Sequence, residues 1–563
     1  MQGENFIFTP LGGGKEIGAN AWHIEWDGIS FLIDCGMHPE RLSWFALPPI
    51  TRIRRLDFVL VSHAHSDHSA ALPYLVKHFP VPVWMTSLTK KLLTPMMKDS
   101  LKLQRRVFSM NRRGGVRCPD LGSPPFSEED AALLFSRIQN LDEGFTHKGL
   151  CVTPFSSGHI LGAVGFVLEK NGRRVLFTSD IAVQKKMSAP ALDLPEGPFD
   201  LVISEGTRGG EPAAPGNEGT REDEEERAMH IMSRVIQRGA KVLFPAFVME
   251  RAQSVALLVM RARREGYIPK KTPLFMAGLA DSMTALHAKY LDIDIDYEPV
   301  ALHQWIPVMN TIKSAIIIAG SGMLSSGSGA ARLAETLLSA RRKEHALIFP
   351  GYCAPLSPGG RLLAREMSPA SGHTYAYING RVIEVRTSEI HQVHLSCHAG
   401  AGELISIVKN LGARAVILVH GDELALDTLA RSLRKELGKD CPIAVPENGE
   451  SVSYNGRPAE SLRAPADAHT TEELLRENPW HIEALQNAVE QAGNNDGHIA
   501  PTRRLRAVLR LLSEHALRDG NLPKARRILC TADGVLPDDE ICSLLRRIDD
   551  IACLCPQNDI PIL

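Results

Sequence analysis

The sequence predicts an α/β protein with several domains, and three observations support this fold class. Short apolar runs typical of buried strands alternate with segments of helical spacing through residues 1–465. Several of these runs end in Asp, Glu or His, as in FLIDCG, LVSHAHSDH and VILVHGD. The length of 563 residues suggests about three or four domains. Because parallel strands bring their carboxyl ends to one sheet edge, residues far apart in the chain can meet there.

The composition is that of an ordinary globular protein, with 44% hydrophobic and 23% charged residues. The formal net charge of −2 provides no global positive field, so a nucleic-acid partner would need a local basic groove. The sequence contains no run of 18 apolar residues, so no membrane-spanning helix is predicted. The segment MQGENFIFTPLGGG does not resemble a secretion signal. The ten cysteines are scattered without a C-x-x-C pair, which indicates reduced thiols. We therefore expect a cytoplasmic protein that does not contact membranes.

Residues 1–208 are expected to form the first part of one domain, with a polar cluster after the apolar run FVLV. His63 and His65 are two residues apart on an extended segment, so they can bind one ion, while Asp67 and His68 on the following turn can bind a second. Buried carboxylates and imidazoles are costly to desolvate, and a divalent cation offsets that cost. A chance collection of turn residues is the alternative. Further metal-capable or ionisable groups at strand ends and turns are Asp34, His159, Asp180 and Glu205.

The residues after the cluster, SAALPYLVKHF, are typical of a helix, and we expect Ser66 or Asp67 to be its N-cap. A further helix is predicted at EEDAALLFSRIQNL, before the run GLCVTPFSSGH. The acidic stretch NEGTREDEEER is expected to be a solvated first helical turn.

Residues 209–368 predict a second α/β unit, because strands and helices alternate again. Within it, the loop GSGMLSSGSG leads into an amphipathic helix, and its backbone N–H groups could bind a substrate phosphate. A plain strand-to-helix turn is an equally good interpretation. The candidate phosphate contacts are Ser321, Gly322, Ser325 and Ser326.

Residues 369–465 are expected to return to the first domain and to supply His398 and His420. Residues 466–563 differ, because they show helical spacing broken by Gly and Pro. We interpret them as a C-terminal helical module that contacts RNA, a protein partner or a second copy of the chain. Four arginines there could touch phosphates, although a solvated helix face is the commoner role of such residues: Arg503, Arg504, Arg506 and Arg510.

The motif HAHSDH, followed by a single His, then Asp, then His, resembles the metallo-β-lactamase superfamily. The segments LGGGKEIGAN, SSGHILGA, ISEGTRG, GAKVLFPAFVMERAQ and IAGSGMLSSGSG are similar to its β-CASP branch of nucleic-acid-processing nucleases. The resemblance covers about residues 6–450. It implies an αββα sandwich with an inserted α/β β-CASP domain and a substrate cleft between the two lobes.

The resemblance also implies a role for each candidate residue. One Zn²⁺ would be held by His63, His65 and His159, and a second by Asp67, His68 and His420, with Asp180 between them. Mn²⁺ can occupy similar ligands. Asp34 would support a zinc ligand from behind. The catalytic residues would be Asp67, His398 and Glu205. His398 would protonate the leaving oxygen or position a phosphate, and Glu205 would orient the His398 side chain. A histidine satisfied within the core is the alternative for His398.

The function implied is a zinc-dependent ribonuclease, in which water activated by two ions hydrolyses RNA phosphodiester bonds. His420 favours RNA over DNA, because RNA-processing members carry a histidine at its position. HLSCHAGAGEL resembles RNase J, whereas DCGMHP and LVHGDE resemble the cleavage-and-polyadenylation endonuclease, and Ser254 replaces the usual Glu after RAQ. Endonucleolytic and 5′–3′ exonucleolytic action therefore both stay open. The rival functions are a catalytically idle RNA-binding scaffold, a DNA nuclease of the same branch and a small-molecule hydrolase.

Overall fold

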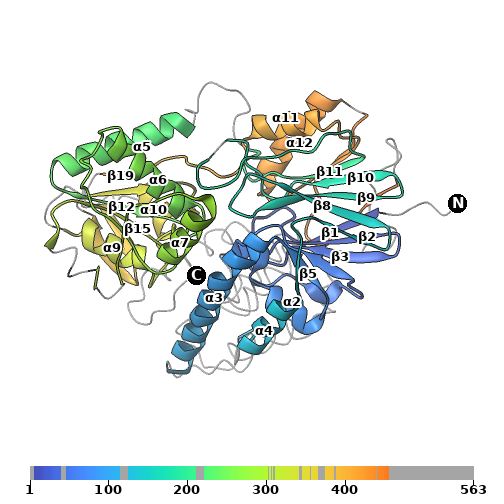
Figure 1. Cartoon of the computed structure of the whole chain (residues 1–563), viewed down its shortest axis with the longest axis horizontal. Coiled ribbons are helices and arrows are strands. Elements are labelled where there is room, and N and C mark those ends of the chain that lie inside the picture. Colours follow the sequence, from blue (N-terminus) through green and yellow to red (C-terminus); the bar gives the residue numbers. More distant parts are fainter. Residues whose placement is uncertain are drawn as a thin grey trace, which may run out of the picture. The chain divides into compact units, whose positions relative to one another are not determined.

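The structure is a computed structural model of the whole chain (Figure 1). It describes residues 6–39, 46–113, 124–184, 186–210, 221–301, 304–305, 307, 311–340, 345–354, 357–364, 374–385, 389–438 and 440–455. The predicted C-terminal module, 466–563, lies outside the described residues. Among the helices that the described residues form, none is both long enough and apolar enough to cross a bilayer.

Two mixed seven-stranded sheets form the first lobe. The first sheet has the order β22 (Val452–Tyr454), β1 (Phe6–Gly12), β2 (Ala21–Trp26), β3 (Ile29–Ile33), β4 (Phe58–Leu60), β5 (Val83–Met85) and β6 (Ile138–Asn140). The second has the order β21 (Ile443–Ala444), β20 (Val416–Val419), β11 (Leu201–Glu205), β10 (Arg173–Phe177), β9 (Val164–Lys170), β8 (Leu150–Ser156) and β7 (Phe145–His147). Strand β20 pairs with β11 and β22 with β1, so the segment after the insertion completes both sheets.

The two sheets pack face to face across an aromatic core that includes Trp22, Phe58, Phe166 and Phe177. Helices α2 (Leu72–His78), α3 (Ser87–Arg113) and α4 (Glu128–Arg137) cover the outer face of the first sheet. Helices α11 (Ala401–Asn410) and α12 (Glu423–Leu437) cover the second. Figure 1 shows these four layers in order, and the predicted αββα sandwich is confirmed.

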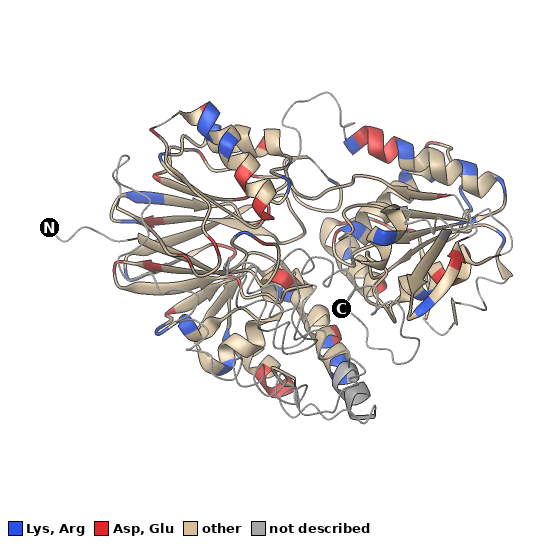
Figure 2. Cartoon of the chain, turned by 180° about the vertical axis from the view of Figure 1, so that it is seen from behind, with Lys and Arg blue, Asp and Glu red and all other residues tan. Residues whose placement is uncertain are grey.

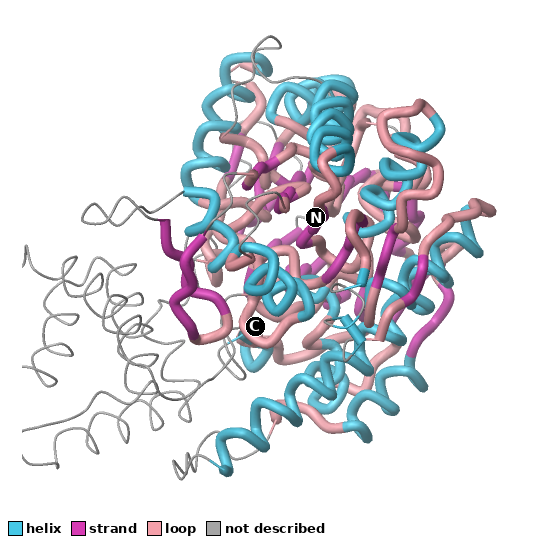
Figure 3. Tube along the Cα trace, turned by 90° about the vertical axis from the view of Figure 1, so that its left-hand side faces the viewer, coloured by secondary structure: helices cyan, strands magenta, loops and turns pink. Residues whose placement is uncertain are grey.

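The second lobe is the inserted α/β unit, and its strands are paired in parallel. Its six-stranded sheet has the order β14 (Glu298–Pro299), β13 (Leu274–Met276), β15 (Ala315–Ala319), β12 (Lys241–Pro245), β16 (Ala346–Phe349) and β19 (Ile390–Gln392). Both faces are covered by helices, as parallel sheets require (Figure 3). The helices are α5 (Arg221–Gln237), α6 (Arg251–Arg264), α7 (Leu279–Leu291), α9 (Gly329–Leu338) and α10 (Pro358–Ala364), beside the hairpin β17 (Thr374–Ile378) and β18 (Arg381–Val385).

Helix α5 begins with an acidic turn, as the sequence predicted, and this turn is the red segment near the start of the helix in Figure 2. Glu222, Asp223 and Glu224 form it, where the helix dipole favours negative charge. Strand β11 ends at Glu205, and residues 211–220 lie outside the described residues. The predicted boundary between 208 and 209 therefore stays a prediction.

The predicted N-cap of the helix after the polar cluster is wrong. Helix α1 (Ser66–Ser69) already includes Ser66 and Asp67, so its N-cap is His65, which has no capping side-chain hydrogen bond. The chain then turns at Ala70 and starts α2, where Pro73 is in the first turn. Because the Asp67 carboxylate lies against His68 and His420 instead, it serves the polar cluster and does not cap the helix.

Candidate metal centre

The candidate ligands gather at adjoining ends of the two sheets of the first lobe. His63 and His65 follow β4, and Asp67 and His68 lie on α1 directly after them. The second sheet supplies the others, because His159 follows β8, Asp180 follows β10 and His420 follows β20. The parallel pairing of β10, β11 and β20 places the last two of these turns at one edge.

The first group of ligand atoms centres on His65. Its Nδ1 lies 3.1 Å from Nε2 of His63 and 3.1 Å from Nε2 of His159. Asp180 Oδ2 closes the group, at 3.6 Å from His63 Nε2 and 3.5 Å from His159 Nε2. These four residues form a cluster of the size that can hold one metal ion.

The second group lies beside the first and shares Asp180. His68 Nε2 is 3.4 Å from Asp180 Oδ2 and 3.6 Å from Asp67 Oδ2. His420 Nε2 is 3.6 Å from Asp67 Oδ2, and its Nδ1 is 3.4 Å from Asp180 Oδ1. The structure thus brings together all seven side chains that the sequence proposed as ligands.

These separations fit divalent cations. Zinc ligands at about 2.0–2.2 Å in a tetrahedron stand roughly 3.3–3.6 Å from one another, close to the distances found in both groups. His420 Nε2 and Asp180 Oδ1 are buried and have no hydrogen-bond partner among the described residues. Buried polar atoms without partners are rare and costly, and a bound cation would satisfy both. The donor set therefore suits a pair of ions.

A buried carboxylate holds two of the imidazoles from behind. Asp34 Oδ2 accepts a hydrogen bond from His68 Nδ1 at 2.8 Å and another from the Ser62 hydroxyl at 2.6 Å. Ser62 Oγ in turn lies 2.9 Å from Nδ1 of His63 and can accept a hydrogen bond from it. Each contact leaves Nε2 of the imidazole free for an ion. Asp34 thus lies behind two candidate ligands, and its role in supporting them stays a prediction.

Other supporting groups were not predicted from the sequence. His420 Nδ1 lies 2.8 Å from Oγ1 of Thr207, whose hydroxyl donates to the His420 carbonyl at 3.0 Å. His159 Nδ1 donates to the carbonyl of Cys397 at 2.9 Å. Asn20 Nδ2 donates to Asp67 Oδ2 at 3.3 Å and also lies 2.9 Å from His68 Nε2, the atom that would face an ion. Thr207 and Asn20 lie in the segments ISEGTRG and LGGGKEIGAN, and the similarity of these segments to the family was the only sequence feature that could have pointed to them. A backbone carbonyl cannot be identified from the sequence.

The electrostatics keep three imidazoles in the form that binds metal. Burial lowers the pKa of His63 and His159 well below the usual value, and it lowers the pKa of His65 to about 4. Burial also disfavours charge on His68, but the carboxylates of Asp180 and Asp67 outweigh this and hold its pKa well above the usual value. Metal binding would therefore release the proton that His68 retains between these carboxylates.

His398 lies beside the cluster in contact with Glu205. Its Nδ1 is 3.0 and 3.1 Å from the two carboxylate oxygens of Glu205, which also accepts from the N–H of Ile181 at 2.8 Å. Its Nε2 is 4.0 Å from Asp180 Oδ2, and the side chain is 19% exposed. Burial opposes the charge on this imidazole, but Glu205 outweighs it and raises the pKa of His398 to about 10. The pair can present a proton to a ligand at the centre.

The predicted phosphate loop lies in the second lobe, between β15 and α9. Ser321 Oγ accepts from the N–H of Ser325 at 2.8 Å, which closes the loop on itself. Ser328 is the N-cap of α9 and accepts from the N–H of Ala331 at 3.1 Å. The predicted loop and amphipathic helix are thus present, while phosphate contacts of Ser321, Gly322, Ser325 and Ser326 stay a prediction.

A buried ion pair joins this second lobe to the metal centre. Lys186 Nζ donates to the carbonyl of His159 at 2.5 Å and lies 3.7 Å from the Glu250 carboxylate, at the start of α6. Glu250 also accepts from the hydroxyls of Ser188, at 3.0 Å, and Ser254, at 2.6 Å. The backbone of one candidate ligand is therefore tied to the inserted unit.

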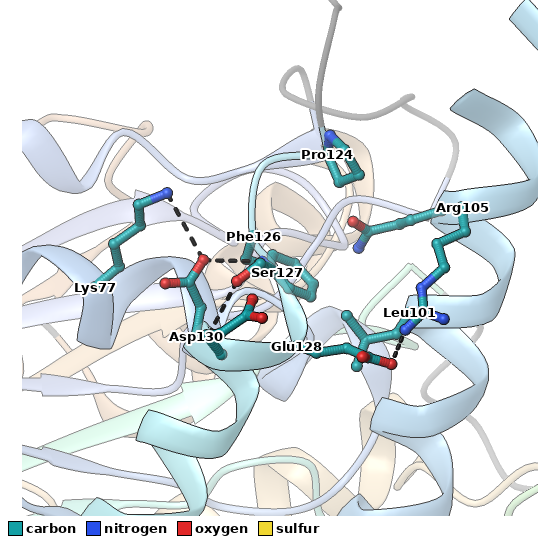
Figure 4. Close-up of a pocket in the computed structure, with 10 residues that line it drawn as sticks. Lys77, Leu101, Arg105, Pro124, Phe126, Ser127, Glu128 and Asp130 are labelled. Atoms are coloured by element: carbon teal, nitrogen blue, oxygen red, sulfur yellow. Dashed lines mark hydrogen bonds and ion pairs between the residues drawn. The ribbon is translucent and has the colours of Figure 1, made fainter. Parts of the chain in front are cut away.

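A cavity of about 490 Å³ lies elsewhere, among α2, α3 and α4 (Figure 4). Asp130 at its wall lies 3.7 Å from Lys77 and accepts a hydrogen bond from the backbone N–H of Ser127 at 2.8 Å, while the side chain of Gln104 has no hydrogen-bond partner among the described residues. It contains none of the candidate ligands. It is therefore not a part of the metal centre.

Family models match three stretches of the chain. The metallo-beta-lactamase superfamily model matches residues 14–198, and the Beta-Casp domain model matches residues 252–362. The model of a Zn-dependent metallo-hydrolase RNA specificity domain matches residues 382–444. The last stretch contains His398 and His420.

Curated relatives include cleavage and polyadenylation specificity factor subunit 3-I of Arabidopsis thaliana, 27% identical over 80% of this chain and 64% of the relative. Endoribonuclease YSH1 of Kluyveromyces lactis is 25% identical over 76% of this chain and 57% of its own length. The chain thus spans less than two thirds of each of these two relatives. A solved structure of a protein of unknown function from Enterococcus faecalis V583 matches with a TM-score of 0.48 and 14% identity, over 80% of this chain and all of that one.

Proposed function

We propose that this chain, which belongs to the β-CASP branch of the metallo-β-lactamase superfamily, is a zinc-dependent ribonuclease that hydrolyses RNA phosphodiester bonds endonucleolytically. The observation that carries the proposal is the convergence of seven ligand side chains beside the His398–Glu205 pair. Four imidazoles contact the one carboxylate of Asp180 there. An arrangement of this kind suits the clamping of a phosphodiester between two cations.

Two zinc ions would be held by the two groups of ligands, with Asp180 shared between them. Bound divalent cations neutralise charge on phosphate oxygens and make water more acidic. Support for zinc comes from the imidazole-rich donor set and from the description of the matched RNA specificity domain. Manganese is the alternative, because it accepts the same carboxylate and imidazole ligands.

The chain's own residues orient the substrate and move a proton. His398 Nε2 faces the centre, and Glu205 holds the ring from the other side through Nδ1. We assign His398 as the acid that protonates the leaving 3′ oxygen, which produces a 3′-hydroxyl and a 5′-phosphate. Asp67 would bind the second cation and orient the attacking water. Glu205 would keep the imidazolium charged and fixed in direction.

RNA is the proposed substrate because the RNA specificity domain matches residues 382–444 and relatives are named endoribonucleases. Cys35, Cys353, Cys397 and Cys441 are buried free thiols, which fits a reducing compartment such as the cytoplasm. A protein partner or dimerisation through residues 466–563 stays a prediction, because that module lies outside the described residues.

The test is the substitution Asp67→Ala, which should abolish metal-dependent cleavage of end-labelled RNA while circular dichroism shows a folded protein. Asp440→Ala is the matched control, because Asp440 is an exposed aspartate outside both ligand groups. It should cleave like the wild type. Retained activity in Asp67→Ala would refute the assignment.

The same assay separates the rival functions. RNA binding without cleavage, together with less than one metal ion per chain, would support the idle scaffold. Equal cleavage of matched RNA and DNA strands would support a nuclease without preference for RNA. Substrates with 5′-triphosphate, 5′-monophosphate or 5′-hydroxyl ends distinguish internal cuts from 5′–3′ degradation by product length.

A further inference from the structure

Three exposed apolar side chains lie on loops beside the metal centre. Among the described residues, seven large apolar side chains are exposed, and these include Met187, Phe247 and Tyr352 at 64%, 43% and 65% exposure. Phe247 follows β12, and Tyr352 follows the neighbouring parallel strand β16. Because paired parallel strands end at the same sheet edge, the two aromatic residues belong to one rim of the inserted unit.

Phe247 is held in place from one side. A Cβ atom on Gly322 would lie 3.0 Å from Cδ2 and 3.2 Å from Cε2 of the ring, so the ring packs against the backbone of the predicted phosphate loop. The Phe247 carbonyl accepts from the N–H of Ala252 at 3.0 Å, which fixes the backbone of the turn. The ring is thus a supported aromatic surface that remains 43% exposed.

The turn that carries Phe247 also contacts the candidate catalytic residues. Glu250 accepts from Ser188, the residue after Met187, at 3.0 Å. Arg251 Nη2 lies 3.4 Å from Sγ of Cys397, which directly precedes His398. A Cβ atom on Gly351 would lie 3.4 Å from Arg251 Nε, so the loop of Tyr352 also reaches this point. The loops that carry the three exposed residues are therefore linked by these contacts to residues that adjoin the metal centre.

The surroundings of these side chains suit a nucleic acid. Arg251 is only 7% exposed; its Nη1 lies 3.8 Å from the Glu250 carboxylate, and its Nε has no hydrogen-bond partner among the described residues. The loop under Phe247 is rich in small polar residues, and its N–H groups at Ser325 and Gly327 are held by Ser321 Oγ and Asn379 Oδ1. An exposed aromatic ring close to a cationic side chain and to the candidate metal centre suits a nucleotide, which is an aromatic base attached to an anion. A protein partner would need a larger continuous apolar patch.

We propose that Phe247 stacks on a nucleobase of single-stranded RNA next to the scissile phosphate, with Tyr352 and Met187 contacting neighbouring bases. The proposal rests on the ribonuclease function and specifies a residue that positions the substrate of that same site. Bases of a duplex already stack on one another, so their faces cannot reach a protein ring unless the strand is opened. The platform therefore selects single-stranded segments, and it does so through base faces, without reading a particular sequence.

The test pairs a protein change with a substrate change. Phe247→Ala and the wild type are compared in binding a single-stranded RNA oligonucleotide and a set of the same oligonucleotides, each with one abasic nucleotide at a scanned position. Phe247→Ala should weaken binding of the intact RNA by roughly 5- to 100-fold, since base stacking is lost. At one scanned position the abasic RNA should bind both proteins equally. Phe247→Trp should bind like the wild type.

The control is Val382→Ala, because Val382 is another exposed apolar residue, on the hairpin strand β18. It should leave all affinities unchanged. If Phe247→Ala weakens binding to the intact RNA and to every abasic RNA equally, its role is structural and the proposal is overturned. If it binds every RNA like the wild type, the surface serves another partner and the proposal is overturned as well. Absence of cleavage by the wild type would contradict the ribonuclease function alone, because binding decides this inference.

Discussion

At the scale of single residues, three of the strained backbone positions lie where the candidate site is built. Asp34, Ser179 and His420 have φ angles of 59°, 55° and 54°, in the left-handed region that favours glycine. All three lie just after a strand that ends at the metal centre. The turns direct the side chains of Asp34, Asp180 and His420 toward the centre. Non-glycine residues tolerate this conformation only where the surrounding structure holds them in it, which is typical of functional sites.

The residue-scale prediction concerns His398. His398→Ala should slow cleavage of ordinary RNA by roughly 10²–10⁴-fold, because the leaving oxygen then departs without a proton. RNA with a bridging sulfur at the leaving position should restore much of the rate, since a thiolate leaves without protonation. Cleavage rates on the two substrates under single-turnover conditions measure this.

Asp67→Ala is the comparison for this experiment, because Asp67 belongs to the ligand groups and supplies no proton. The sulfur substrate should not rescue it. Equal slowing of His398→Ala on both substrates would show that His398 has a role other than that of an acid.

Residue types at strand ends marked candidate ligands in the sequence, the family resemblance completed the set of seven, and the structure brings these side chains together, while their role as ligands stays a prediction. The sequence was insufficient for the groups that orient them. Thr207 and Asn20 are ordinary polar residues until the fold places them against His420 and His68. The Cys397 carbonyl is invisible in a sequence, since every residue has one.

At the scale of elements, the start of α6 shows a local choice that sequence preference does not predict. Its N-cap is Glu250, with a φ angle of 66° and no capping hydrogen bond from its side chain. Its carboxylate is buried against Lys186, Ser188 and Ser254 instead. Helix propensity favours Ser, Thr, Asp or Asn at such a position, so the contact between lobes overrides the local preference.

The element-scale prediction is that Glu250→Gln lowers the free energy of unfolding by about 3 kcal/mol, because it leaves the Lys186 ammonium buried without its counter-charge. Lys186→Met together with Glu250→Gln should lower it by less than the two single changes combined, since neither charge then remains unpaired. Urea unfolding of the three variants measures this coupling.

The same helix offers the control. Glu265 and Arg261 form an exposed ion pair at 2.8 Å at the other end of α6. Glu265→Gln should change the free energy of unfolding by less than about 1 kcal/mol, because water screens that pair. Additive effects of the Lys186 and Glu250 substitutions would contradict a direct interaction between them.

At the scale of the whole molecule, the candidate ligands come from chain segments on both sides of the inserted unit. The first-lobe sheets are completed only when β20 and β22 return after the inserted unit. Alternation of strands and helices in the sequence predicted α/β structure for both lobes, and the family resemblance supplied the insertion. Its predicted end at residue 368 is too early, because β17, β18 and β19 belong to the second lobe. Alternation could not predict the sheet order, because which strands pair is decided by tertiary packing, as in the parallel pairing of β11 with β20.

The metal centre therefore joins early and late parts of the chain, and its ions should stabilise the fold as a whole. Cations that bind only the folded state add about 4 kcal/mol when their free concentration is 1,000 times the dissociation constant. Dialysis against a chelator should accordingly lower the melting temperature by roughly 5–10 °C, and added Zn²⁺ should restore it. Differential scanning calorimetry measures this melting temperature without reference to cleavage.

His420→Ala should melt below the wild type in zinc and respond less to the chelator, because one ligand group has lost its only member from beyond the insertion. A wild-type protein whose melting temperature ignores both chelator and zinc would show that the seven side chains hold no ion.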